Sequence, residues 1–170
     1  MTGTGPLELL AIDHLLTEEE RDIQASVREF VDRRVRPGIA DAFERGEADL
    51  TLLTFGNGVP MSLRVARRLA EQDISAEVVD LRWLAPLPMA DVLAAARRSG
   101  RVLVVDETRR TGGVGEGVVT GLVEAGFAGP IRRVASQDSF IPLGPAAAHV
   151  LLGEEEIEKS ALELFGKEPT

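Results

Sequence analysis

RVLVVDETRRTGGVGEGV, the stretch from Arg101 to Val118, decides the fold of this chain. Its first six residues, RVLVVD, contain a run of four apolar residues, three of them β-branched, which predicts a buried strand over Arg101–Asp106. A glycine-rich run, Thr111–Gly117, follows, and a helix is expected from about Glu116 to Ala125. A strand, a glycine-rich turn and a helix in this order are typical of α/β proteins.

The sequence on both sides repeats this alternation. Helices of ten residues or more between strands indicate parallel strands joined by right-handed crossovers, with helices on both faces of the sheet. We therefore predict one α/β domain over residues 48–170. The further strands are expected at Leu50–Phe55, Ala76–Leu81 and Ile131–Ala135, and the further helices at Val59–Gln72, Met89–Ser99 and Glu154–Phe165.

Residues 1–47 follow a different pattern and are predicted to form a helical extension. Thr17 and Glu20 match a capping box, and an apolar stripe at helical spacing follows them. One amphipathic helix cannot bury its own apolar face, so this stripe is a candidate contact surface for the α/β domain, a second copy or another chain. The stripe consists of Ile23, Val27, Phe30, Val31 and Val35.

Composition excludes several classes of function. The chain of 170 residues has a formal charge of −9, which argues against nucleic acid and anionic membranes as partners. It has no cysteine, which excludes disulfides, thiolate catalysis and cysteine-ligated metal sites. No apolar run approaches the length of a membrane span, and the first residues lack the features of a signal peptide. We therefore expect a cytoplasmic protein.

Two neighbouring features could carry chemistry. Asp106 and Glu107 end the central strand, where ligands bind in open parallel sheets. Such carboxylates could serve acid–base catalysis or bind a cation, but ion pairs with Arg109 and Arg110 are the simpler interpretation. The glycine-rich loop with Gly112, Gly113 and Gly115 could bind a phosphate, yet its spacing fits no phosphate motif and Glu116 would repel an anion. A tight turn that lets helix and strand pack closely is the simpler interpretation of these glycines.

Other features favour contact with a protein. The loop Ser139–Pro145 contains Phe140, Ile141 and Pro142, an apolar segment that suits docking better than chemistry. Trp83 follows a predicted strand and is expected at a packing or interface position. The two histidines, His14 and His149, are expected to have no catalytic role.

Four blocks in order give the chain a family resemblance: DLTLLTFG, AEVVDLRWLAPLP, RVLVVDETRRTGGVGEGV and DSFIPLGPAAAHVLL. Over about residues 48–165 they resemble the C-terminal domain of transketolase-like thiamine enzymes. The resemblance is to the beta subunit of 2-oxo acid dehydrogenases, the decarboxylase component of the pyruvate and branched-chain complexes. It implies a three-layer α/β/α sandwich with a mostly parallel five-stranded sheet. Residues 8–47 are similar to the start of acyl-CoA dehydrogenases of the glutaryl-CoA type.

The resemblance also implies a function in assembly. In that family this domain holds subunits together and faces the acyltransferase core, while other domains bind thiamine diphosphate and magnesium. The chain has no Gly-Asp-Gly motif, so we expect no catalytic, cofactor-binding or metal-binding residue in this chain alone. We expect a non-catalytic assembly domain whose partner is a second copy or a thiamine-enzyme subunit. One alternative is a part of a split 2-oxo acid dehydrogenase that is active only with a partner chain. The other is a small-molecule or nucleotide sensor that uses the glycine-rich loop with Asp106 and Glu107.

Overall fold

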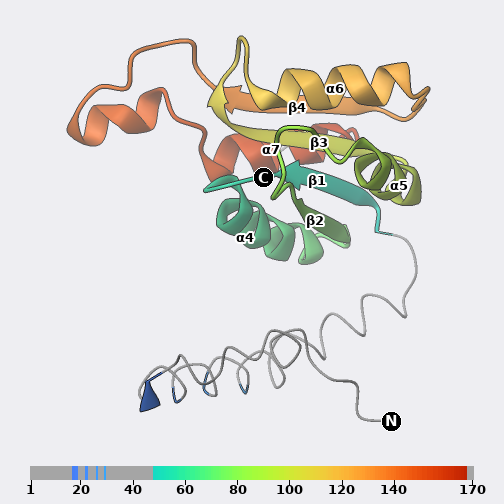
Figure 1. Cartoon of the computed structure of the whole chain (residues 1–170), viewed down its shortest axis with the longest axis horizontal. Helices are drawn as coiled ribbons and strands as arrows, with labels where there is room; N and C mark the ends of the chain where they lie inside the picture. Colours follow the sequence, from blue (N-terminus) through green and yellow to red (C-terminus); the bar gives the residue numbers. More distant parts are fainter. Residues whose placement is uncertain (1–16, 19–21, 23–25, 27–28, 30–47, 168–170) are drawn as a thin grey trace. The chain divides into compact units, whose positions relative to one another are not determined.

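The structure is a computed structural model that describes residues 17, 18, 22, 26, 29 and 48–167 (Figure 1). The chain divides into two compact units, Met1–Gly46 and Glu47–Thr170. In the first unit five residues are described. The predicted contact stripe, including Val27 and Val31, therefore lies outside the described residues.

The second unit alternates strands and helices along the chain. Each of the first three strands is followed by a helix, and a short 3-10 helix and a final α-helix follow the fourth strand. The elements are β1 (Leu50–Thr54), α4 (Gly58–Ala70), β2 (Ala76–Asp80), α5 (Met89–Ser99), β3 (Val102–Arg109), α6 (Val114–Glu124), β4 (Ile131–Ser136), η3 (Gly144–His149) and α7 (Glu154–Glu163).

The strands form one sheet in the order β2-β1-β3-β4, and all three pairings are parallel. The described residues thus give four strands, one fewer than the resemblance implies. Because the strands are parallel, their carboxyl ends share one edge of the sheet. The chain leaves β1 toward β2 and then crosses back to β3, so the strand order reverses direction between β1 and β3, at the type of position where open α/β sheets bind ligands.

The core has two layers, one on each face of the sheet. Alternate residues of a strand point to opposite faces, so Leu103 packs in one layer and Val104 in the other. Helices α4 and α7 cover the first face, and α5 and α6 cover the second (Figure 1). Burial on both faces explains why β1 and the first part of β3 are continuous apolar runs.

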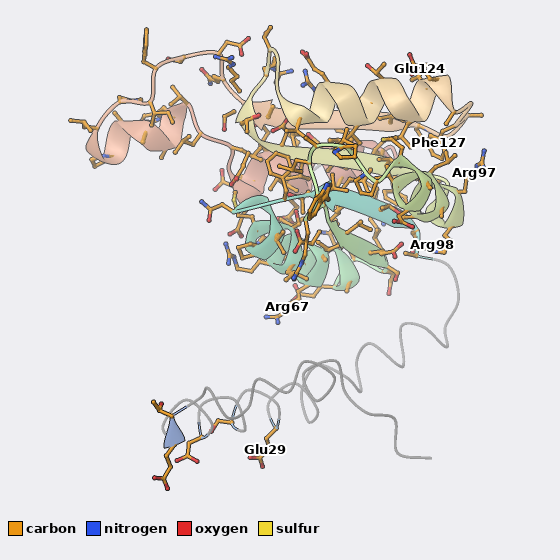
Figure 2. All side chains as sticks on the ribbon, viewed as in Figure 1. Glu29, Arg67, Arg97, Arg98, Glu124 and Phe127 are labelled. Atoms are coloured by element: carbon orange, nitrogen blue, oxygen red, sulfur yellow. The ribbon has the colours of Figure 1, made fainter. Side chains whose placement is uncertain are left out.

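Ion pairs join the outer sides of α4 and α7. Arg68 donates to Glu154 at 2.9 Å and to Glu158 at 2.6 Å, and Arg64 donates to Glu154 at 2.7 Å. Donation from these arginines holds the pKa of the Glu154 carboxyl below its usual value. Arg67, on the same helix, points away from the body of the domain (Figure 2).

Helices and strands lie close to where the sequence places them, with two differences at the carboxyl end of the sheet. β3 runs to Arg109, three residues beyond its expected end, because a bulge after Asp106 carries its pairing with β4 onward. The loop expected at Ser139–Pro145 leads into η3, which begins at Gly144. None of the helices in the described part of the chain is long and apolar enough to cross a membrane.

Candidate functional site: the carboxyl edge of the sheet

The carboxyl ends of the four strands and the loops that follow them form the carboxyl edge. It comprises residues 55–57 after β1, 81–88 after β2, 106–113 at the end of β3, and 137–151 after β4. All of the predicted site residues described by the structure lie on this edge or on the first turn of α6.

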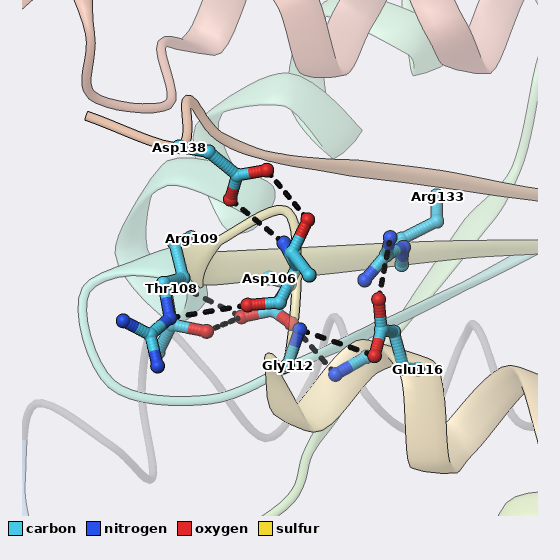
Figure 3. A network of polar contacts seen from close by, with 9 residues as sticks. Asp106, Thr108, Arg109, Gly112, Glu116, Arg133 and Asp138 are labelled. Carbon is cyan, nitrogen blue, oxygen red and sulfur yellow. Dashed lines mark hydrogen bonds and ion pairs between the residues drawn. The ribbon is translucent and has the colours of Figure 1, made fainter.

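Asp106 lies at the centre of the edge and is completely buried. Its Oδ2 accepts the backbone N–H of Gly115 at 2.6 Å, in the first turn of α6. Its Oδ1 accepts the N–H of Thr108 at 2.9 Å and the Thr108 hydroxyl at 2.7 Å (Figure 3). The side chain is therefore an internal anion at the positive end of a helix, and its three donors offset the cost of its burial.

The glycine-rich loop wraps tightly around this carboxylate. A Cβ atom at Gly113 would lie 2.6 Å from Asp106 Oδ2, and one at Gly115 would lie 2.8 Å from it. The N–H of Gly112 donates to Glu116 Oε2 at 3.1 Å. A bound phosphate would need these N–H groups and this space, so the contacts favour the tight-turn interpretation of the loop.

Glu107 also places a carboxylate at a helix N-terminus, on the opposite face of the sheet from Asp106. Its Oε2 accepts the N–H of Asn57 at 2.7 Å, just before α4 begins. Gly56 makes this approach possible, because its φ is +54° and a Cβ there would lie 2.1 Å from Glu107 Oε1. Successive residues of β3 thus each place a carboxylate at a helix N-terminus, Asp106 at α6 and Glu107 at α4.

This arrangement corrects the expected ion pairs. Among the described residues no arginine pairs with Asp106 or Glu107. Arg109 instead donates from Nε to the carbonyl oxygen of Thr111 at 3.1 Å. The two carboxylates point into the sheet faces toward helix N-termini, whereas Arg109 and Arg110 are exposed beyond the bulge.

A segment that we call the arm, residues 138–149, extends from the end of β4. Its ends are held together, because the N–H of Gln137 donates to the Val150 carbonyl at 2.8 Å and the Gln137 side chain donates to the His149 carbonyl at 3.0 Å. The arm extends away from the rest of the domain, in orange in Figure 1. It carries Phe140 and Leu143, each 97% exposed, and Ile141, 64% exposed.

Asp138 joins the arm to the glycine-rich loop. Its carboxylate accepts the N–H of Thr111 at 2.8 Å and the Thr111 hydroxyl at 2.5 Å (Figure 3). These two donors hold the pKa of the Asp138 carboxyl below its usual value, and Arg109 and Arg110 contribute in the same direction. The two hydrogen bonds from Thr111 to Asp138 could not be predicted from the sequence, because 27 residues separate the two positions.

Exposed apolar side chains gather at this edge. Among the described residues, eight large apolar side chains are exposed, and six of them belong to the edge loops. Besides the three of the arm these are Trp83, Leu84 and Leu151. The two elsewhere, Leu63 on α4 and Val123 on α6, are isolated. A cluster of this kind marks a contact surface more often than scattered residues do.

A cavity of about 330 Å³ opens between these elements. It lies where β1 and β3 end and is lined by Asn57, Met61, Arg64, Glu107, Ser136 and Leu152, among others. The Ser136 hydroxyl in its wall already has partners, because it donates to the Glu107 carbonyl at 2.9 Å and accepts from the N–H of Leu152 at 3.0 Å. No group of three or more His, Asp or Glu side chains suited to a metal occurs within the described ranges.

Comparisons with known proteins identify the domain. Residues 42–157 match the family model of the transketolase C-terminal domain. The chain is 33% identical over 127 residues to the pyruvate dehydrogenase E1 component subunit beta of Bacillus subtilis, covering 73% of this chain and 39% of that one. It is 32% identical over 155 residues to the subunit of the same name from Staphylococcus epidermidis, covering 88% of this chain and 47% of that one.

Solved structures agree on the fold. A split-gene transketolase, described as an inactive β4 tetramer, superposes with a TM-score of 0.63 at 24% identity, over 72% of this chain and 40% of that chain. A 2-oxoglutarate:ferredoxin oxidoreductase from Magnetococcus marinus gives a TM-score of 0.50 at 18% identity, over 70% of this chain and 18% of that chain.

The chain spans less than half the length of these relatives. Its family model begins at residue 42, and the resemblance of residues 8–47 to acyl-CoA dehydrogenases stays a prediction. With four blocks of sequence in order, a matching parallel sheet and a family model that covers most of the second unit, this chain belongs to the transketolase C-terminal domain family.

Proposed function

We propose that this chain is a non-catalytic assembly domain that joins subunits through the carboxyl edge of its sheet. The observation that carries the proposal is the clustering of exposed apolar side chains on this edge, with Phe140 and Leu143 held out on an arm whose base is closed. Apolar and aromatic side chains presented by an anchored loop are typical of protein contact surfaces.

The relatives support a function in assembly. Their names describe one subunit of a pyruvate dehydrogenase component and the β chain of a split transketolase that forms a tetramer. Partners of the same kind, a thiamine-enzyme subunit, a second copy or the acyltransferase core, are therefore the candidates for this chain.

The edge chemistry argues against a thiamine diphosphate site within this chain. Two helix N-termini on this edge already hold a carboxylate of β3, Asp106 at α6 and Glu107 at α4. A diphosphate there would meet negative charge instead of free N–H donors. If thiamine chemistry occurs, a partner chain must supply the cofactor site, which is the alternative of a split 2-oxo acid dehydrogenase.

Affinity capture from the native host with three baits tests the assembly function. The baits are the unaltered chain, an edge variant with Phe140→Glu and Leu143→Glu, and a control variant with Leu63→Glu and Val123→Glu, the exposed apolar residues away from the edge. We expect the unaltered and control chains to capture a subunit of a thiamine enzyme or more of the same chain, and the edge variant to lose that capture. Equal capture by all three baits would contradict the proposal.

The split-enzyme alternative predicts an additional result. If a captured chain carries a thiamine site, its decarboxylation of 2-oxo acids should rise when this chain is added and should not rise with the edge variant. If the decarboxylation activity does not change on addition of this chain, the split-enzyme alternative is wrong and the assembly function stands alone.

A further inference from the structure

The pair Asn57–Gly58, which follows β1 at the carboxyl edge, carries a reactive amide. Asn57 is the only asparagine in the chain, it precedes a glycine, and it is exposed. In such a pair the main-chain nitrogen of the glycine can attack the side-chain amide of the asparagine, because glycine has no side chain to hinder the approach. Asparagine is among the labile residues of proteins. The pair is therefore a candidate site for spontaneous deamidation.

The fold requires the glycine of this pair. A Cβ atom at Gly58 would lie 2.0 Å from Oγ1 of Thr54, a completely buried residue of β1. Helix α4 begins at Gly58, so this close approach decides how the helix meets the end of the strand. The side chain of Asn57 makes no capping hydrogen bond to α4. Packing thus fixes the glycine next to an amide that the helix does not hold.

The backbone of the folded turn opposes the reaction in two ways. Ring closure needs the Asn57 side chain and the Gly58 nitrogen on the same side of the Cα–C bond, and the helical angles of Asn57, φ −67° and ψ −21°, turn them apart. The nitrogen must also lose its proton, and the Gly58 N–H donates that proton to the Phe55 carbonyl at 3.0 Å. The turn therefore has to open before Asn57 reacts.

Glu107 on β3 holds this turn closed. Its Oε2 accepts the N–H of Asn57 at 2.7 Å, so it binds the residue whose backbone must rotate for the reaction. Its negative charge also opposes the charge that the Gly58 nitrogen carries once its proton is lost. One carboxylate thus acts on both the conformation and the electrostatics that the reaction needs.

We propose that Asn57 is a deamidation site gated by Glu107, intact while the turn is closed and reactive when it opens. The Gly58 nitrogen gives its proton to solvent and forms a bond to Asn57 Cγ. The bond from Cγ to the amide nitrogen breaks, and this nitrogen takes a proton and leaves as ammonia. Water then opens the cyclic imide at either carbonyl carbon, which leaves aspartate or isoaspartate at position 57. Isoaspartate lengthens the main chain by a methylene group just before α4, so it changes how Gly58 packs on Thr54.

Incubation of the full chain in mildly alkaline buffer, followed by peptide mass spectrometry, measures the rate at Asn57. The chain unfolded in urea should react fastest, and the folded chain much more slowly. Glu107→Ala should speed the reaction of the folded chain roughly fivefold, because the turn loses a hydrogen bond that keeps it closed. Glu107→Gln keeps an acceptor without the charge, so its rate should lie between the two.

Val92→Ala is the matched control for global stability. Val92 is completely buried in the core layer on the other face of the sheet, so its truncation destabilises the whole domain without removing a contact of the turn. While this variant stays folded by circular dichroism, its rate at Asn57 should remain close to that of the unaltered chain. Three results would overturn the proposal: an unfolded chain that keeps Asn57 intact, a folded chain that reacts as fast as the unfolded one, or a Glu107→Ala protein that reacts no faster than the control.

Discussion

The glycine-rich loop and the arm lie on the same edge of one sheet, but the loop packs against a buried side chain and the arm exposes its own. The loop closes on Asp106, whose carboxylate accepts from the N–H groups of Gly115 and Thr108, and the N–H of Gly112 donates to Glu116. The arm holds its base together by backbone hydrogen bonds and leaves Phe140 and Leu143 in solvent. A motif that resembles a ligand site is therefore a structural element here, and a loop without any chemical motif carries the exposed surface.

Removal of the buried carboxylate should have the largest effect. Asp106→Ala leaves the N–H of Gly115 and both Thr108 donors without their acceptor, so we expect the free energy of unfolding to fall by about 3 kcal/mol. Urea denaturation followed by circular dichroism measures it. Glu107→Ala is the matched control, because Glu107 accepts one N–H at a partly exposed site, and about 1 kcal/mol is expected. Equal losses would show that Asp106 does not hold the loop.

Two glycines of α6 sharpen the contrast within one helix. Gly115→Ala places a Cβ 2.8 Å from Asp106 Oδ2 and 2.9 Å from Arg133 Cδ, so we expect a loss of about 2 kcal/mol in unfolding free energy. Gly117→Ala meets only the mobile end of Leu87 at 3.3 Å and gains helix propensity, so its effect should lie between zero and a gain of about 1 kcal/mol. Thermal or urea unfolding of both variants measures the difference. If Gly115→Ala does not lower the stability, the loop does not pack closely against Asp106.

What the sequence predicts correctly follows the same division between the two regions. The strands and helices could be predicted because apolar runs such as RVLVVD and the helical spacing of Val65 and Leu69 are local signals. The acceptor function of Asp106 could not, because it depends on a bulge and on a turn that brings Gly115 back to the strand. The helix η3 was missed because its sequence, GPAAAH, has no apolar stripe to mark it.

The candidate surface was only partly visible in the sequence. Phe140, Ile141 and Pro142 indicated docking, because an apolar segment in a loop has no place in the core. Their gathering with Trp83, Leu84 and Leu151 follows from the parallel sheet, which brings loops far apart in sequence to one edge. The five strands and the arginine pairs were expectations that the described residues do not meet.

The Asp138–Thr111 contact joins the two regions, so its loss should separate them without unfolding the domain. The pKa of Asp138 is lowered in the folded protein. Its carboxylate therefore contributes fully to the stability of the fold above the ordinary pKa of 3.8. This contribution to stability disappears as the pH falls through the lower pKa of the folded state. Asp138→Ala should therefore lower the melting temperature slightly at pH 7 and not at all at the acid end. Ser139→Ala controls for a change within the arm, and a pH-independent difference would contradict the charge assignment.

Changes in the arm itself should have the smallest effect on folding. Phe140→Glu and Leu143→Glu alter side chains that are 97% exposed, so the unfolding free energy extrapolated to low protein concentration should change by less than about 0.5 kcal/mol. Only the concentration-dependent part of the melting temperature should disappear, because that part comes from association. A large loss at low concentration would place these side chains in the fold and not at an interface.

The closed base of the arm has a consequence for how such domains diversify. Because Gln137 and Val150 meet directly, the chain between them can lengthen, shorten or change composition while β4 and α7 keep their places. Under the proposed assembly function, recognition and folding are then inherited on separate stretches of sequence. An engineer could exchange residues 138–149 for those of a relative and transfer its choice of partner on an unchanged scaffold.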